Sequence, residues 1–279
     1  MNYKKNNVVI VTIVSLLFIL SSAIVYFVFF VDKTTNDNAK DSIYVKVTDK
    51  DIIDELKEVI ISNNLIELAR YEKNIDNINT MNNSQKLNMA FNKIINDKKY
   101  NYDEKIDANL LEEYFKNNFK DMIYYNNENI LCSCKEKLYI YDKKTNTYEY
   151  NIEHSEHLIY KTDPYYIKVL SVDKKNDTYI IKVTYVWSTY SIDGYTNVGY
   201  ASYNDSLNRQ NKLFEIEVPD ISVNYNLPID STIEINKDMY AIKEIETNYE
   251  LYKNKLHKYT YTFIRENDIY KLLSFKFEK

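Results

Sequence analysis

Residues 165–190 read YYIKVLSVDKKNDTYIIKVTYVWSTY, and this stretch predicts the central hairpin of a β-sheet. Residues 165–172 and 179–190 are rich in β-branched and aromatic side chains and flank the turn-forming DKKNDT. Along the second strand, alternate side chains point to opposite faces of the sheet. The face predicted to be buried holds Tyr179, Ile181, Val183, Tyr185 and Trp187, and the face predicted to meet water holds Lys182, Thr184 and Ser188.

Two further hairpins follow the same pattern. Residues 138–141 and 147–150 flank a turn-rich DKKTN, and residues 258–265 and 269–277 flank END. In the last hairpin Tyr259, Tyr261 and Phe263 alternate and face one way. These pairs indicate an antiparallel sheet.

Helical periodicity precedes the strands. The pattern predicts a helix that is capped at Thr48 to Asp51 and runs through Arg70, a second that opens at Ser84, and a third that opens at Asp107. Their apolar stripes are most simply core faces. Helices followed by hairpins predict an α+β fold, in which helices pack on a curved antiparallel sheet. Residues 191–255 hold both glycines and read as an insertion or edge elements.

The amino-terminal part predicts a membrane anchor. Residues 8–31, VVIVTIVSLLFILSSAIVYFVFFV, contain no charge and are long enough to cross a bilayer, which takes about 20 apolar residues. Lys4 and Lys5 precede this run and predict a cytoplasmic tail at residues 1–7. Residues 32–42 then form a linker, and residues 43–279 form one extracytoplasmic domain. A cleaved signal peptide with its cleavage site at residues 21–23 is the alternative.

The charge balance argues against nucleic acid as a partner. The chain has a formal net charge of −5, and its first 31 residues contain two lysines and no carboxylate, so the remainder is more acidic still. Binding along a phosphate backbone requires a basic surface that releases counterions.

Glycine usage excludes several kinds of site. The chain has only two glycines, Gly194 and Gly199, so it contains no P-loop, no G-x-G-x-x-G and no G-x-S-x-G motif. Nucleotide-dependent and α/β-hydrolase chemistry are therefore not expected, and no cofactor is assigned.

Two cysteines and two histidines form a candidate set of metal ligands in the sequence. Cys132 and Cys134 lie two residues apart, and His154 and His157 follow three apart among carboxylates, which together could supply four zinc ligands. The spacing fits no finger pattern, so unpaired thiols and a solvated loop are the simpler reading, and a disulfide is a further alternative. A thiol enzyme would use Cys134 with His154 or His157. Sortases resemble this plan, but there the histidine precedes the cysteine.

Carboxylates and aromatics offer two weaker hypotheses. The pairs Glu112/Glu113 and Glu215/Glu217 could serve glycoside hydrolysis, although such pairs arise freely among 41 acidic residues. Trp187 could stack on a sugar ring, but Ile181 and Val183 share its face, which favours a core position.

A resemblance extends over residues 85–190 and 256–279. The stretches KLNMAFNKIIND, LLEEYFKNNFKD, LYIYDKKTNTYEYN and HKYTYTFIRENDIYKLLSF resemble uncharacterised single-pass membrane-anchored proteins of low-GC Gram-positive bacteria. The order of helices and Tyr-rich strands resembles the NTF2-like and cystatin-like folds. The plan also resembles conjugation-machinery assembly proteins with NTF2-like domains. No activity is implied by the resemblance.

These observations lead to one functional expectation. The chain is expected to be a binding or scaffold module of the cell envelope, held in the cell membrane, with an envelope protein or wall polymer as partner. A glycan or small-ligand binder and an envelope enzyme are the alternatives. No catalytic residue is assigned.

Overall fold

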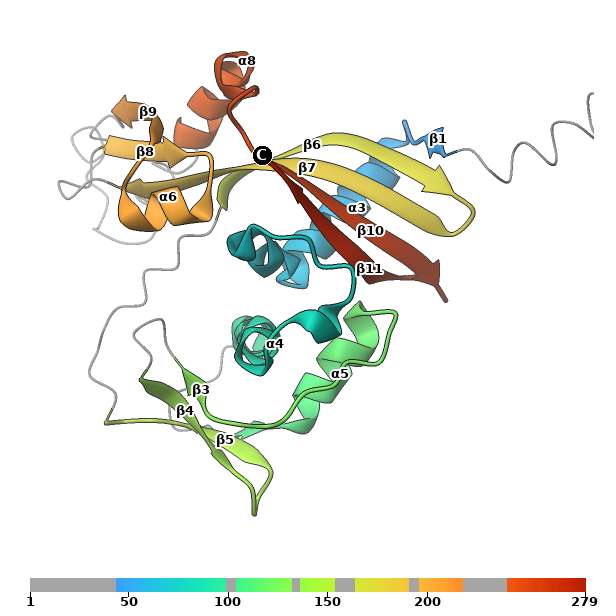
Figure 1. Cartoon of the computed structure of the whole chain (residues 1–279), viewed down its shortest axis with the longest axis vertical. Coiled ribbons are helices and arrows are strands. Elements are labelled where there is room, and N and C mark those ends of the chain that lie inside the picture. The colour runs from blue at the N-terminus through green and yellow to red at the C-terminus, as the bar shows by residue number, and fades with distance from the viewer. Residues whose placement is uncertain (1–43, 99–103, 132–135, 154–163, 191–195, 218–239) are drawn as a thin grey trace, which may run out of the picture. The chain divides into compact units, whose positions relative to one another are not determined.

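The computed structural model describes residues 44–98, 104–131, 136–153, 164–190, 196–217 and 240–279. Within these ranges the chain is an α+β protein with helices and a curled antiparallel sheet, as predicted (Figure 1). The predicted tail at residues 1–7, membrane helix at 8–31 and linker at 32–42 lie outside the described ranges.

The larger sheet is built around β7 (Thr178–Tyr190). Its neighbour β6 (Pro164–Lys175) pairs along one edge, while β10 (Lys258–Glu266) and β8 (Thr196–Tyr200) share the other edge, each pairing with one half of β7. The remaining strands of this seven-stranded sheet are β1 (Val45–Lys46), β9 (Lys212–Glu217) and β11 (Ile269–Glu278).

The predicted buried face of β7 is confirmed. Its five members are at most 1% exposed, and Tyr259, Tyr261 and Phe263 of β10 are 0% exposed beside them. The hydroxyls of Tyr185 and Tyr261 lie 2.8 Å apart, so this pair satisfies two polar groups inside the core.

The predicted wet face of β7 is wrong for its second half. Thr184 and Ser188 are buried, and Val186 between them is 0% exposed. A second apolar cluster covers this part of the sheet and includes Val186, Ala201, Ile245, Tyr249 and Leu256. The strand is therefore buried on both sides there.

The chain after β7 supplies that cover. Residues 240–247 and α8 (Tyr249–Tyr252) are helical and contribute Ile245 and Tyr249 to the second cluster. The helix α6 (Tyr203–Asn208) follows β8 in the chain, and its Tyr203 packs on Trp187 at the opposite face. Within the segment predicted as an insertion or edge elements, β8 and β9 extend the larger sheet.

The helical part begins with α3 (Lys50–Ser62), and its cap is Asp49 rather than the predicted Thr48. The carboxylate of Asp49 accepts a hydrogen bond from the Asp51 N–H, as the side chain directly before a helix commonly does. The predicted continuous helix to Arg70 is interrupted at Asn64, whose φ is 55°, and a 3-10 helix, η2 (Leu65–Tyr71), follows.

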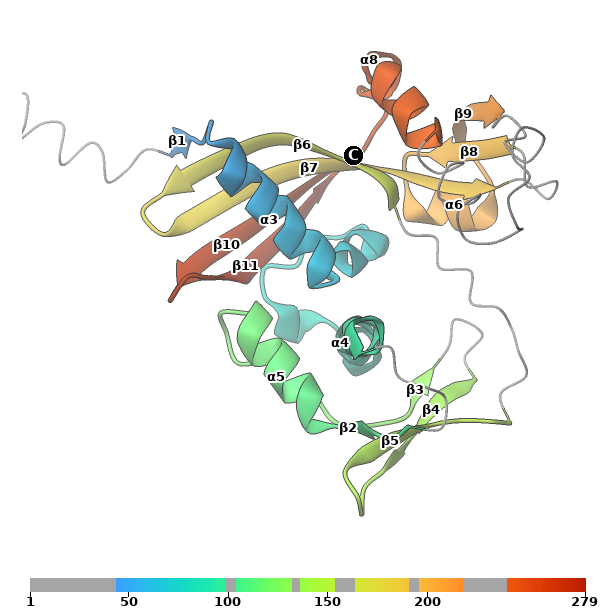
Figure 2. The same cartoon turned by 180° about the vertical axis from the view of Figure 1, so that it is seen from behind.

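Two longer helices lie between the larger sheet and a second, four-stranded sheet (Figures 1 and 2). A short 3-10 helix, η3 (Ile78–Thr80), leads into α4 (Asn83–Lys98), and α5 (Asn109–Asn118) follows. The second sheet has the order β2-β5-β4-β3, with β2 (Ile106–Asp107), β3 (Ile130–Leu131), β4 (Lys137–Asp142) and β5 (Thr147–Tyr150).

Phe91 of α4 joins the helices to the second sheet. Its ring centroid lies 4.6 Å from that of Tyr139 and 5.0 Å from that of Tyr148, both in edge-on geometry. The hairpin predicted around residues 142–146 is confirmed, but it belongs to this separate sheet and not to the one built on β7.

Candidate binding groove

The sequence-predicted site residues fall into two groups. Cys132, Cys134, His154 and His157 lie outside the described ranges, so the structure does not test the zinc or thiol hypotheses. Within the described ranges, no group of three or more His, Cys, Asp and Glu side chains is placed to hold a metal ion.

The hypotheses based on carboxylates and on Trp187 concern described residues. Glu112 and Glu113 are exposed on α5, and Glu215 forms an ion pair with Lys212 on β9. Trp187 is 0% exposed and packs against Tyr185 and Tyr203, so the core interpretation is confirmed and Trp187 cannot serve as a sugar platform.

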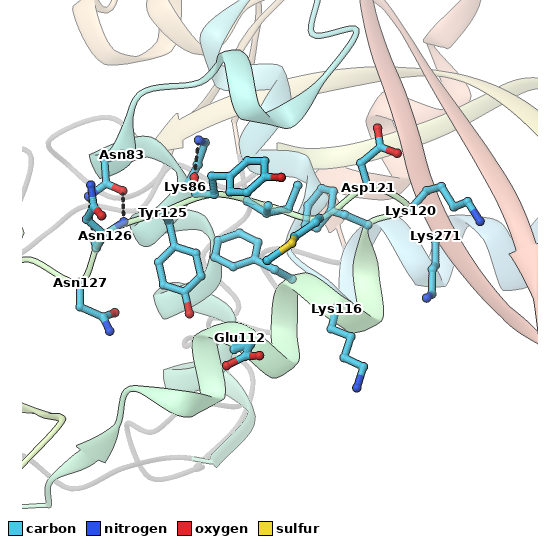
Figure 3. A pocket seen from close by; sticks show the side chains of 15 residues that line it. Asn83, Lys86, Glu112, Lys116, Lys120, Asp121, Tyr125, Asn126, Asn127 and Lys271 are labelled. Carbon is cyan, nitrogen blue, oxygen red and sulfur yellow. Dashed lines mark hydrogen bonds between the residues drawn. The ribbon is translucent and has the colours of Figure 1, made fainter.

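A groove of about 890 Å³ lies along residues 119–127, next to α4 and α5 (Figure 3). Its volume falls within the range of roughly 300–1,000 Å³ that is typical of ligand clefts. The lining consists of Asn83, Lys86, Glu112, Phe115, Lys116, the run from Phe119 to Asn127, and Lys271.

The run along the groove is extended. Phe119 forms a parallel bridge with Leu272 of β11, and from Met122 onward the run forms no bridge with a strand of the described ranges. From Met122 to Asn129 the even-numbered residues are exposed and the odd-numbered residues are buried or half-buried. This alternation is the period of a β-strand. Ile123 and Tyr125 therefore point inward, and the ring of Tyr125 lies 5.0 Å from that of Phe115 on α5.

Side chains of η3 and α4 take the place of a neighbouring strand. The amide of Asn79 donates to the Met122 carbonyl at 2.9 Å and accepts from the Tyr124 N–H at 2.7 Å. The amide of Asn83 donates to the Asn126 carbonyl at 2.7 Å and accepts from the Asn126 N–H at 2.8 Å (Figure 3). Each asparagine thus supplies the donor and acceptor that a paired strand would offer.

Lys86 completes this edge. Its ammonium donates to the carbonyl of Tyr124 at 2.8 Å and to that of Asn79 at 3.3 Å. The residue is only 5% exposed, and burial lowers the pKa of its ammonium. Two carbonyl dipoles therefore hold a buried cation against the extended run.

Four lysines and two carboxylates line the groove, in a chain whose net charge is negative. Lys120 and Lys271 both pair with Glu266 of β10, and the hydrogen bond from Lys120 is the main cause that lowers the Glu266 pKa. Glu112 lies toward the hydroxyl of Tyr125, whose pKa is raised by burial and then by this carboxylate (Figure 3).

Two large apolar side chains are exposed on the outer face of the run. Met122 is 74% exposed and Tyr124 is 68% exposed. Both side chains also line the groove, and exposed methionine and tyrosine are common where proteins bind partners.

The sequence pattern did not reveal this site, because residues 122–129 fall between the predicted helices and hairpins and were assigned to neither. The signal that could have found it is the alternation in MIYYNNEN at residues 122–129, which has the period of a strand.

No helix within the described ranges is both long and apolar enough to cross a membrane. Comparison of the chain with family models, curated proteins and solved structures found no match. The resemblance to membrane-anchored Gram-positive proteins and to NTF2-like and cystatin-like folds stays a prediction.

Proposed function

We propose that this chain is a membrane-anchored binding or scaffold module of the cell envelope, which holds a partner in the groove along residues 119–127. Residues 8–31 cross the cell membrane in this proposal, with residues 1–7 in the cytoplasm and the α+β domain outside. The proposal includes no catalytic step.

The observation that carries the proposal is the pairing of exposed apolar and cationic groups in one groove. Met122 and Tyr124 would bury apolar surface on binding, which is worth about 25 cal/mol per Å² removed from water. The lysines at the rim would orient a partner of opposite charge.

Site-specific photocrosslinking in the native cells tests the binding part. The full chain would carry benzoylphenylalanine at Met122 or Tyr124, and Leu251, which is 70% exposed on α8, is the matched control position. We expect mass spectrometry to identify the same crosslinked partner from both groove positions and not from position 251. Equal crosslinking at all three positions, or none at the groove, would contradict the proposal.

Membrane fractionation tests the location. We expect the full chain to remain with the membrane after carbonate extraction and a chain lacking residues 1–40 to be released. Protease treatment of intact cells should then remove the α+β domain, whereas a protected domain would reverse the proposed orientation.

A further inference from the structure

The extended run along the groove has two backbone edges that differ in hydrogen bonding. In an extended chain, successive residues direct their N–H and C=O groups to opposite sides. Met122, Tyr124 and Asn126 direct theirs toward Asn79, Asn83 and Lys86. Side chains of η3 and α4 thus pair this edge from the Met122 carbonyl to the Asn126 carbonyl.

The opposite edge belongs to the odd-numbered residues. In the part of the chain that the structure describes, the backbone N–H and C=O groups of Ile123 and Tyr125 make no hydrogen bond. Both residues line the groove, and the alternation of an extended chain places their backbone groups on the edge opposite to the one that η3 and α4 pair. Backbone groups in folded proteins are nearly always paired, with water where no protein group is near. This edge is therefore open to a second chain.

We propose that the groove binds an extended acidic peptide, which adds as a strand to the free edge at Ile123 and Tyr125. The inference rests on the proposed binding function and names the partner's chemistry. Donors and acceptors that repeat at every second residue, about 6.6 Å apart, match the backbone of another extended peptide. A sugar polymer has no such repeat of alternating donors and acceptors.

The lysines that line the groove favour acidic side chains on the bound peptide. Within the described residues Lys116 forms no ion pair, and Lys120 and Lys271 share the single carboxylate of Glu266. The groove is thus locally cationic in an acidic protein, which favours aspartate or glutamate on the incoming strand. Exposed Met122 and Tyr124 offer apolar contacts to the residues between these carboxylates.

Binding would be measured with the full chain purified in detergent. The probe is a fluorescein-labelled octapeptide of alternating valine and glutamate, and its counterpart has lysine in place of glutamate. Fluorescence anisotropy should show binding of the glutamate peptide only. Lys116→Glu should weaken this binding about five- to tenfold, while Lys276→Glu, a matched reversal at an exposed lysine of β11, should not.

Hydrogen–deuterium exchange with single-residue fragmentation tests the strand geometry. The amides of Ile123 and Tyr125 should become protected when the glutamate peptide binds, whereas those of Tyr124 and Asn126 are protected already. Binding without this protection would overturn strand addition but leave the groove as a binding site. Equal or tighter binding of the lysine peptide would overturn the acidic preference.

The remaining outcomes separate this inference from the proposed function. If neither peptide binds but crosslinks from Met122 and Tyr124 still identify a partner, the partner is not an extended acidic peptide and only the inference fails. If neither peptide binds and no partner is crosslinked from Met122 or Tyr124, the groove is not a binding site and both proposals are wrong.

Discussion

Gly199 on β8 lies directly opposite Phe214 on β9, and the aromatic ring occupies the space that a side chain at position 199 would need. A Cβ atom built there would overlap the ring. The ring also packs against Tyr252, at 4.6 Å between centroids. An aromatic ring that covers a glycine on the neighbouring strand is a known means of stabilising a sheet edge.

We expect Gly199→Ala to destabilise the protein by about 1–3 kcal/mol, because the Phe214 ring must leave its contact with Tyr252. Thermal unfolding would show a melting temperature lower by several degrees. In a Phe214→Ala background the same glycine substitution should cost little, since the obstacle is gone. A cost that is unchanged in that background would contradict the overlap.

Asn79→Ala and Asn83→Ala should each lower the free energy of unfolding by about 1 kcal/mol, because each removes two hydrogen bonds to the extended run. This corresponds to a shift of about 2–4 °C in melting temperature. The amides of Tyr124 and Asn126 should also exchange faster in the respective variants. Asn117→Ala, an exposed asparagine on α5, is the control that should change neither property.

Alkaline pH should destabilise the protein through its buried tyrosines. Burial raises the pKa of Tyr166 to about 12 and raises that of Tyr261 further, above the ordinary value of 10.0. Above pH 10 the unfolded chain loses phenolic protons that the folded chain keeps, so stability falls as pH rises. Urea unfolding at pH 8 to 11 would measure this slope. Tyr166→Phe should make the slope shallower, and Tyr124→Phe, at an exposed position, should leave it unchanged.

Acidic pH should destabilise the fold through His257. Burial lowers the pKa of its half-buried imidazole below 6.5, an effect that Glu72 partly opposes. As pH falls below 6.5 the unfolded chain takes up a proton more readily than the folded chain does, so stability is lost. The decrease in unfolding free energy between pH 7.5 and 5 should be smaller in His257→Gln than in the natural chain. An identical decrease in both would show that His257 does not contribute.

The strands were predictable because alternation along one strand reports burial directly. Tyr179, Ile181 and Val183 fill the buried face as their spacing indicates. The burial of Thr184 and Ser188 was not predictable, since it depends on residues far along the chain, such as Ile245 and Leu256, that cover the opposite face. Local pattern cannot report which distant segment returns to a sheet.

The groove was harder to predict than the core. Its inner residues Ile123 and Tyr125 follow a strand period. Asn79 of η3 and Asn83 of α4 lie 43 to 45 positions before the residues that they pair with. Nothing in the local sequence of either segment indicates that asparagine amides would replace a strand.

The use of asparagine amides in place of a strand also makes the groove sensitive to deamidation. Asparagine side chains hydrolyse slowly to carboxylates, which accept hydrogen bonds but cannot donate them. At Asn83 this change would set a charged oxygen against the carbonyl of Asn126, where an N–H now donates. A long-lived molecule would then lose its groove before it loses its core.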